Sequence, residues 1–106
     1  MPKYLVQASY SGEGVQGLRK EGGTSRRDAI ARACASVGGS LDAFYFAFGD
    51  SDVVTVLDLP DNTTAAGVAL LVASSGTVDI KTTVLLTPEE VDAAVKVGGD
   101  YRPPGG

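Results

Sequence analysis

Apolar and polar residues alternate along the start of the chain. From Lys3 to Tyr10 the even-numbered positions are apolar or aromatic, whereas Gln7 and Ser9 occupy odd positions. A repeat of two residues is the period of a half-buried β-strand. Runs rich in β-branched and aromatic residues predict three more strands, over residues 41–48, 53–59 and 78–86. Because residues 43–48 are apolar or aromatic at every position, we expect that strand to be covered on both faces.

Two segments between these strands carry apolar residues at intervals of three and four, the period of an amphipathic helix. The first begins at Ser25, which is spaced as a capping pair with Asp28, and ends at Gly38-Gly39. The second is capped by Asp61 or Asn62 and ends before Gly76. The apolar positions are Ile30, Ala33, Cys34 and Val37 in the first helix, and Ala65, Val68, Ala69 and Val72 in the second.

Two shorter helices are also expected. The glycine-punctuated segment 11–24 is predicted to hold a short helix that carries Val15 and Leu18. The run Thr87-Pro88-Glu89-Glu90 is typical of a helix start, because threonine caps, proline takes the first helical position and Glu90 completes the capping box. That helix should end near Val97, and the Gly- and Pro-rich residues 98–106 predict an extended or mobile tail.

The order of these elements is strand, helix, strand, strand, helix, strand, with a terminal helix appended. It predicts an α+β, ferredoxin-like βαββαβ fold, in which a four-stranded antiparallel sheet carries both main helices on one face. A chain of 106 residues has room for one core. We therefore expect one domain over residues 1–97 and a C-terminal tail over 98–106.

We predict that the more apolar side of each strand faces the helices. The opposite face of the sheet, called the open face, then has no helix over it. The predicted helix-facing residues are Tyr4, Val6, Ala8, Phe44, Phe46, Phe48, Val54, Val56 and Ile80. The open face then carries Leu5, Gln7, Ser9, Ala43, Tyr45, Ala47, Val53, Thr55, Leu57, Lys81, Thr83 and Leu85. An apolar surface of this size is seldom left in water. We expect a homo-oligomer in which the sheets of two copies pack face to face.

Charge and residue usage narrow the functional classes. The net charge is −4, and basic residues cluster only at Arg19-Lys20 and Arg26-Arg27, so no nucleic-acid partner is expected. No apolar stretch has the length of a membrane span and no signal-peptide core precedes the first strand, which predicts a cytoplasmic protein without a membrane partner. The chain has no histidine and one cysteine, Cys34. This removes the commonest general base and zinc ligand, so we expect no metal and no cofactor.

Four segments resemble the GYD domain family, a group of small bacterial proteins in the dimeric α/β-barrel superfamily. They are Pro2-Lys3-Tyr4, residues 45–54, Leu59-Pro60-Asp61-Asn62 and residues 86–90. The family's Gly-x-Tyr-Asp pattern corresponds to Gly49, Ser51 and Asp52, with serine in place of the tyrosine. The resemblance implies the ferredoxin-like fold and the pairing of two sheets into a barrel. It implies no particular activity, since the superfamily ranges from cofactor-free monooxygenases and haem enzymes to regulatory effector domains.

Three residue groups suggest chemistry elsewhere in the chain. Residues 12–17 match G-x-G-x-x-G, but a chain too short for a doubly wound sheet favours a flexible glycine-rich loop over a dinucleotide-binding turn. A nest of backbone amides that binds an anion, such as a carboxylate, is the intermediate alternative. Asp50 and Asp52 flank Ser51 in a turn, where they either ligate a hard cation or, more commonly, bond their own backbone. Arg26-Arg27 at a helix start is either solvated or meets an anion.

The candidate ligand site lies on the open face, around Gln7, Ser9, Tyr45 and Lys81, with Asp50 and Asp52 at its rim. A phenol and an ammonium group can polarise a carbonyl or hold an anion. The plainer interpretation is that Tyr45 is an interface aromatic and Lys81 a rim charge. We expect the helix-facing side to be filled by phenylalanine rings and Cys34 to be a buried, inert thiol.

Two classes of function remain. The lack of histidine and of a recognisable catalytic set favours a non-enzymatic, small-molecule-binding or regulatory homo-oligomer. The alternative is a cofactor-independent enzyme, monooxygenase- or isomerase-like, that acts on a small organic substrate in the barrel through tyrosine, aspartate or lysine.

Overall fold

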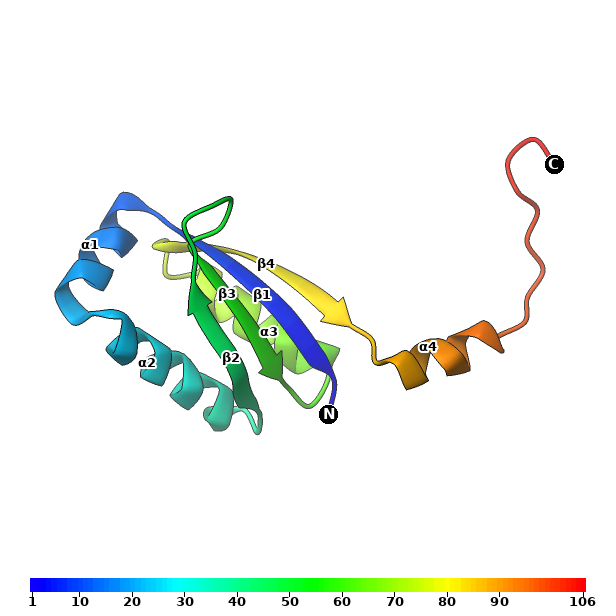
Figure 1. The fold of residues 1–106 in the computed structure, drawn as a ribbon, viewed down its shortest axis with the longest axis horizontal. Helices are drawn as coiled ribbons and strands as arrows, with labels where there is room; N and C mark the ends of the chain where they lie inside the picture. The colour runs from blue at the N-terminus through cyan, green and yellow to red at the C-terminus, as the bar shows by residue number, and fades with distance from the viewer.

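The computed structural model describes residues 1–106 and contains four strands and four helices (Figure 1). In chain order these are β1 (Lys3–Tyr10), α1 (Gly12–Glu21), α2 (Gly23–Ser36), β2 (Ser40–Phe46), β3 (Val53–Asp58), α3 (Asn62–Ala73), β4 (Val78–Leu85) and α4 (Pro88–Val95). The α+β class and the ferredoxin-like order are confirmed. The strand bounds differ from the predicted ones by at most two residues, and the largest difference is that β2 ends at Phe46.

The sheet has the order β2-β3-β1-β4, and all neighbouring strands are antiparallel. β1 and β3 are therefore central, and β2 and β4 are the edges. The register places Val6 of β1 opposite Thr55 on one side and Thr82 on the other. Between β2 and β3 the register shifts between Leu41 and Ala43.

The predicted orientation of β3 is wrong. Its helix-facing residues are Val53, Thr55 and Leu57, all of which are buried. Val54 and Val56 lie on the open face instead. Both sides of this strand are apolar, so counting apolar residues could not choose between them. The observed orientation suits Asp58, which shares a side with Val54 and Val56 and pairs there with Lys3, whereas the predicted orientation would have placed its carboxylate beneath the helices.

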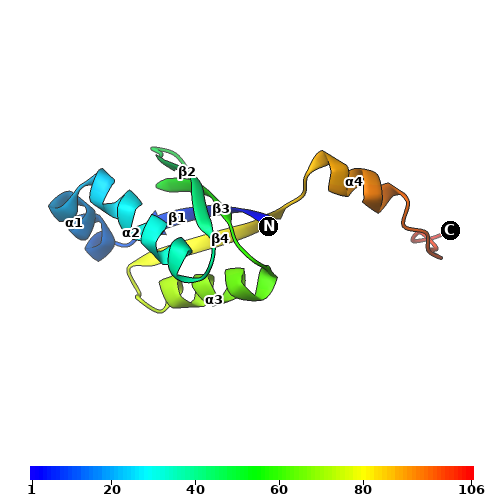
Figure 2. The same ribbon diagram turned by 90° about the horizontal axis from the view of Figure 1, so that it is seen from below.

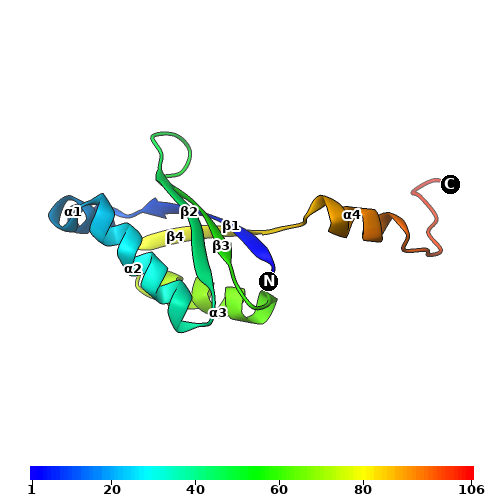
Figure 3. The same ribbon diagram turned by 60° about the horizontal axis from the view of Figure 1, so that its bottom comes forward.

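Both main helices cover one face of the sheet, and no helix covers the other (Figures 2 and 3). α2 packs against β2 and α3 against β4, so the central strands form the floor between them. The core cluster is Tyr4, Cys34, Leu57, Leu59 and Ala65. The Tyr4 hydroxyl donates to Asn62 Oδ1 at 2.6 Å and thereby joins β1 to the start of α3. Burial, and to a lesser degree the charge of Asp61, raises the pKa of Tyr4.

Two of the three predicted helix caps are present. Asp61 accepts a hydrogen bond from the Thr64 backbone N–H at 2.7 Å, and this bond lowers the pKa of the Asp61 carboxyl. Thr87 and Glu90 form the expected capping box of α4. The capping role of Ser25 is wrong, because α2 begins two residues earlier, at Gly23. Gly22, with φ +83°, both ends α1 and precedes α2, a conformation that glycine adopts without strain.

The C-terminal arm, residues 86–106, extends away from the sheet in every view (Figures 1–3). No side chain of α4 is buried, and Val91 and Val95 are exposed. The radius of gyration is 16.9 Å, against about 13 Å for a compact domain of this length. The arm therefore has no packing partner within the chain. None of the helices combines the length and the apolar character that crossing a membrane requires.

Candidate functional site

An apolar cavity of about 70 Å³ lies between the sheet and the two main helices. Residues of all four strands form its floor, with Phe44 from β2, and α2 and α3 form its walls. Sixteen of its 19 lining residues are hydrophobic, so a group bound there would be held by apolar contact. A cavity of about 150 Å³ in another protein binds benzene, which makes this space suitable for a few carbon atoms.

Small side chains leave this space open. Four of the residues that line it are alanines, namely Ala8, Ala33, Ala65 and Ala69. The prediction that three phenylalanine rings would fill the helix-facing side is wrong. Phe48 lies beyond the end of β2 and is fully exposed, and Phe46 is 38% exposed at the end of the strand. Only Phe44 lines the cavity.

Two side chains in the cavity wall, Cys34 and Thr55, carry groups that could react, but burial or a hydrogen bond restricts each of them. Cys34 is 1% exposed, and burial, followed by the charge of Asp42, raises the pKa of its thiol. The thiol is therefore protonated at neutral pH, as we expected for a cysteine within a helical apolar stripe. The hydroxyl of Thr55 donates to the Val6 carbonyl oxygen at 3.0 Å. Neither group has an adjacent base that would make it a nucleophile.

The open face holds the residues that we predicted as a ligand site. The register places Tyr45 opposite Val54, Val54 opposite Gln7, and Gln7 opposite Lys81, so all four form one row across the sheet. Gln7 and Lys81 are neighbours, whereas Tyr45 is two strands from Gln7, about 10 Å at the usual strand spacing. Ser9 lies farther along β1, opposite Asp79.

Tyr45 shows how much of this face is uncovered. It lies on the edge strand β2, and its side chain is 71% exposed. The expectation that this strand is covered on both faces is therefore not met within one chain.

The two turn aspartates differ in their contacts. Asp52 Oδ2 accepts a hydrogen bond from the Tyr10 backbone N–H at 2.8 Å, and the Asp52 N–H donates to the Ala8 carbonyl at 2.8 Å. These bonds fix the end of β1 beside the start of β3. Asp50 is exposed and its carboxylate has no hydrogen bond within the chain. No three histidine, cysteine, aspartate or glutamate side chains are grouped as a metal site.

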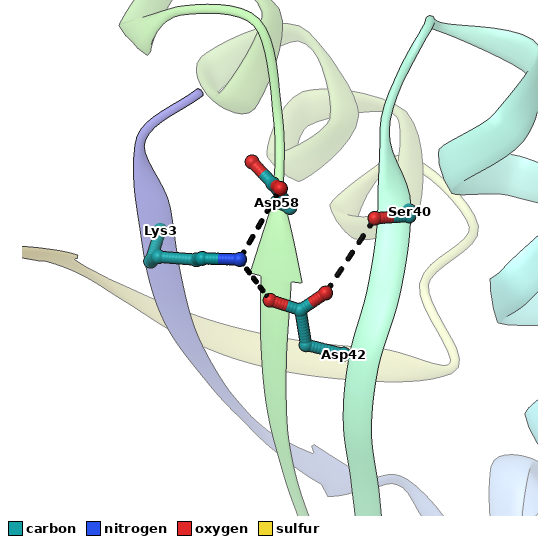
Figure 4. Close-up of polar contacts among 4 residues, drawn as sticks. All are labelled: Lys3, Ser40, Asp42 and Asp58. Carbon is teal, nitrogen blue, oxygen red and sulfur yellow. Dashed lines mark hydrogen bonds and ion pairs between the residues drawn. The ribbon is translucent and has the colours of Figure 1, made fainter.

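Sequence analysis missed an ion cluster at one end of the sheet (Figure 4). Lys3 Nζ lies 2.5 Å from Asp42 Oδ2 and 3.2 Å from Asp58 Oδ2, so the cluster joins β1, β2 and β3. The hydrogen bond to Asp42, and then that to Asp58, raises the pKa of Lys3. The three residues are far apart in the sequence, and only the strand register brings them together.

A second, open groove of about 740 Å³ lies beside α1. The charged residues that line it are Glu13, Arg19, Lys20, Glu21 and Arg26. The glycines of the G-x-G-x-x-G match lie within α1, after its N-cap Ser11. The short helix expected in residues 11–24 is therefore confirmed, and the flexible loop expected over residues 12–17 is wrong. A Cβ at position 14 would collide with the Thr77 carbonyl oxygen and crowd Tyr10, which shows that Gly14 serves the close approach of α1 to the strand ends.

Tyr10, Arg26 and Val78 line both the groove and the cavity. Sequence analysis treated Arg26 and Arg27 as one charged pair, but the structure separates them. Arg27 is exposed and pairs with Asp28 at 3.3 Å, whereas Arg26 is half-buried and takes part in no ion pair. The helical period could have separated the two arginines, because Arg26 lies four residues before Ile30 and therefore on the buried side of α2.

The comparison with known families agrees with this architecture. The family model described as the GYD domain matches residues 4–95, which is most of the chain. No curated protein and no solved structure matches the chain significantly. The chain therefore belongs to the GYD domain family.

Proposed function

We propose that this GYD domain protein is a homo-oligomeric, non-enzymatic binding module that holds a small molecule between its sheet and helices. The observation that carries the proposal is the apolar cavity lined by Ala8, Ala33, Ala65 and Ala69. Protein interiors are normally filled at this depth. Alanine at four positions around one space keeps it available to a ligand.

The chemistry of the cavity wall favours binding over catalysis. The Cys34 thiol is protonated and the Thr55 hydroxyl is engaged with a backbone carbonyl. A covalent mechanism needs a nucleophile beside a general base, and no histidine, aspartate, glutamate or lysine lines the cavity. A binding or regulatory role requires neither.

The oligomer is supported by the face that has no helices. Only seven of 106 residues are buried within one chain, which is a small core for a domain of this length. The central strands leave Leu5, Val54 and Val56 on this face, with Tyr45 standing out from the edge strand. Packing two such faces against each other would bury this surface by the ordinary arrangement of stacked sheets. A pocket around Tyr45, Gln7 and Lys81 would belong to that contact.

Light scattering coupled to size-exclusion chromatography tests the oligomer. We expect a mass above that of one chain at micromolar concentration, and a shift toward the single chain for Tyr45→Arg. Tyr101→Arg is the matched control, because Tyr101 is also largely exposed but lies in the C-terminal arm. A monomeric parent, or equal effects of the two substitutions, would refute sheet-to-sheet pairing.

Binding in the cavity is tested with xenon, an apolar probe of atomic size. Methyl resonances of Val68 and Ile80, which line the cavity, should shift saturably as xenon is added. Those of Val91 and Val95 on α4 serve as the control and should not shift. Uniform shifts across both groups, or none in either, would argue against an accessible cavity.

A further inference from the structure

The groove and the cavity meet at a shared boundary. Tyr10, at the end of β1, Arg26, in the first turns of α2, and Val78, at the start of β4, line both spaces. The groove side is polar and open, and the cavity side is apolar and about ten times smaller by volume, about 70 against 740 Å³. A molecule that entered the cavity from the groove would pass these three residues.

Arg26 brings an unneutralised positive charge to this boundary. It is half-buried and forms none of the ion pairs in the structure, although the chain has an excess of acidic residues. The groove as a whole carries three cationic side chains and two carboxylates, in a protein whose net charge is −4. Because Arg26 lines the open groove and pairs with no carboxylate of the chain, its guanidinium is available to an anion that enters from outside.

Tyr10 supplies a second hydrogen-bond donor. Its backbone is fixed, because its N–H donates to Asp52 Oδ2 at 2.8 Å and it pairs with Val78 on β4. The Tyr10 hydroxyl makes no hydrogen bond within the chain and is free to donate to a ligand. A guanidinium together with a phenol is a donor set that suits a carboxylate.

We propose that the site takes a small monocarboxylate with a short apolar tail, whose head meets Arg26 and Tyr10 and whose tail enters the cavity. This inference rests on the proposed function and adds the chemical class of the ligand. Apolar contact with the alanine-lined wall holds the tail, and the charge-assisted bonds to Arg26 fix its direction. The cavity volume limits the tail to a few carbon atoms.

Three probes separate the contributions of head and tail. Pentanoate carries both, 1-pentanol carries the tail without the charge, and acetate carries the charge with almost no tail. In NMR titrations of the full-length protein, pentanoate should bind at least about tenfold more tightly than 1-pentanol, the effect expected for a hydrogen bond to a charged group. Acetate should bind more weakly than pentanoate.

Variants at the boundary identify the residues responsible. Arg26→Gln should weaken pentanoate by about tenfold or more and leave 1-pentanol unchanged, and Tyr10→Phe should weaken pentanoate by a smaller factor. Arg27→Gln is the matched control, since Arg27 is exposed and paired with Asp28, and it should change neither ligand. Arg26→Lys keeps the charge and gives an intermediate affinity, which separates loss of the charge from any loss of folding.

The outcomes distinguish this inference from the proposed function. If xenon and 1-pentanol bind in the cavity but pentanoate is no tighter, the carboxylate inference is wrong and the binding module stands. Equal weakening of pentanoate by Arg26→Gln and Arg27→Gln would also overturn it, because Arg27 does not line the groove and the effect would then come from the overall charge of the protein. If none of the probes reaches the cavity, both proposals fail.

Discussion

Filling the cavity from α3 is expected to stabilise the protein. Ala69 lines the cavity, and leucine adds three carbon atoms there while remaining a good helix former. At about 24 cal/mol per Å³, a cavity of about 70 Å³ corresponds to about 1.7 kcal/mol. We expect Ala69→Leu to recover about 1 kcal/mol of this free energy, since a new side chain seldom fills a space completely. For a domain of this length that gain raises Tm by about 4–8 °C.

The measurement is urea unfolding at one fixed protein concentration, because association would make stability depend on concentration. Ala66→Leu is the control, since Ala66 lies on the exposed side of the same helix and receives the same side chain. It should change the free energy of unfolding by less than about 0.5 kcal/mol. Overpacking of a filled core costs about 1–3 kcal/mol. A loss of that size in Ala69→Leu alone would show that the space is not open.

Three further predictions concern groups around the site. Asp52→Ala should cost about 1.5 kcal/mol or more of unfolding free energy, because the Tyr10 N–H loses a charged acceptor, whereas Asp50→Ala should be neutral in the same urea titration. Cys34 should react with a thiol reagent only when the fold opens, so labelling of the native protein should be far slower than labelling of the urea-unfolded protein. Fast labelling of the native protein would contradict the burial of Cys34. Because the pKa of Asp61 is lowered in the folded state, its contribution to stability is present at neutral pH and is lost as pH falls through that pKa. Asp61→Asn keeps a capping side chain without the titration, so its melting temperature should fall less steeply with acid than that of the parent, and parallel curves would refute this cause.

The fold was predictable because local signals agreed with one another. The alternation in β1, the helical spacing on α2 and α3, and the cap of α4 each pointed to the element that the structure contains. Four strands and two main helices in that order leave few arrangements. The family resemblance, read from segments along the chain, pointed to the same fold.

The site was harder to predict because it depends on space and not on motifs. A count of apolar residues placed Val54 and Val56 beneath the helices and filled the interior with phenylalanine rings. The position of Asp58 and the end of β2 before Phe48 reversed both conclusions. The helical and strand periods did place Ala8, Ala33, Ala65 and Ala69 on the core-facing sides, but they do not show that these four small side chains surround one space.

The turn that carries the family pattern connects to the cavity through β1. The resemblance matches Asp52 to the aspartate of that pattern. The Asp52 carboxylate holds the backbone of Tyr10, whose side chain lines both the cavity and the groove. That bond runs to a backbone N–H, so it does not depend on the side chain at position 51. A change at Asp52, in contrast, acts on the end of β1 and on the entrance to the cavity together.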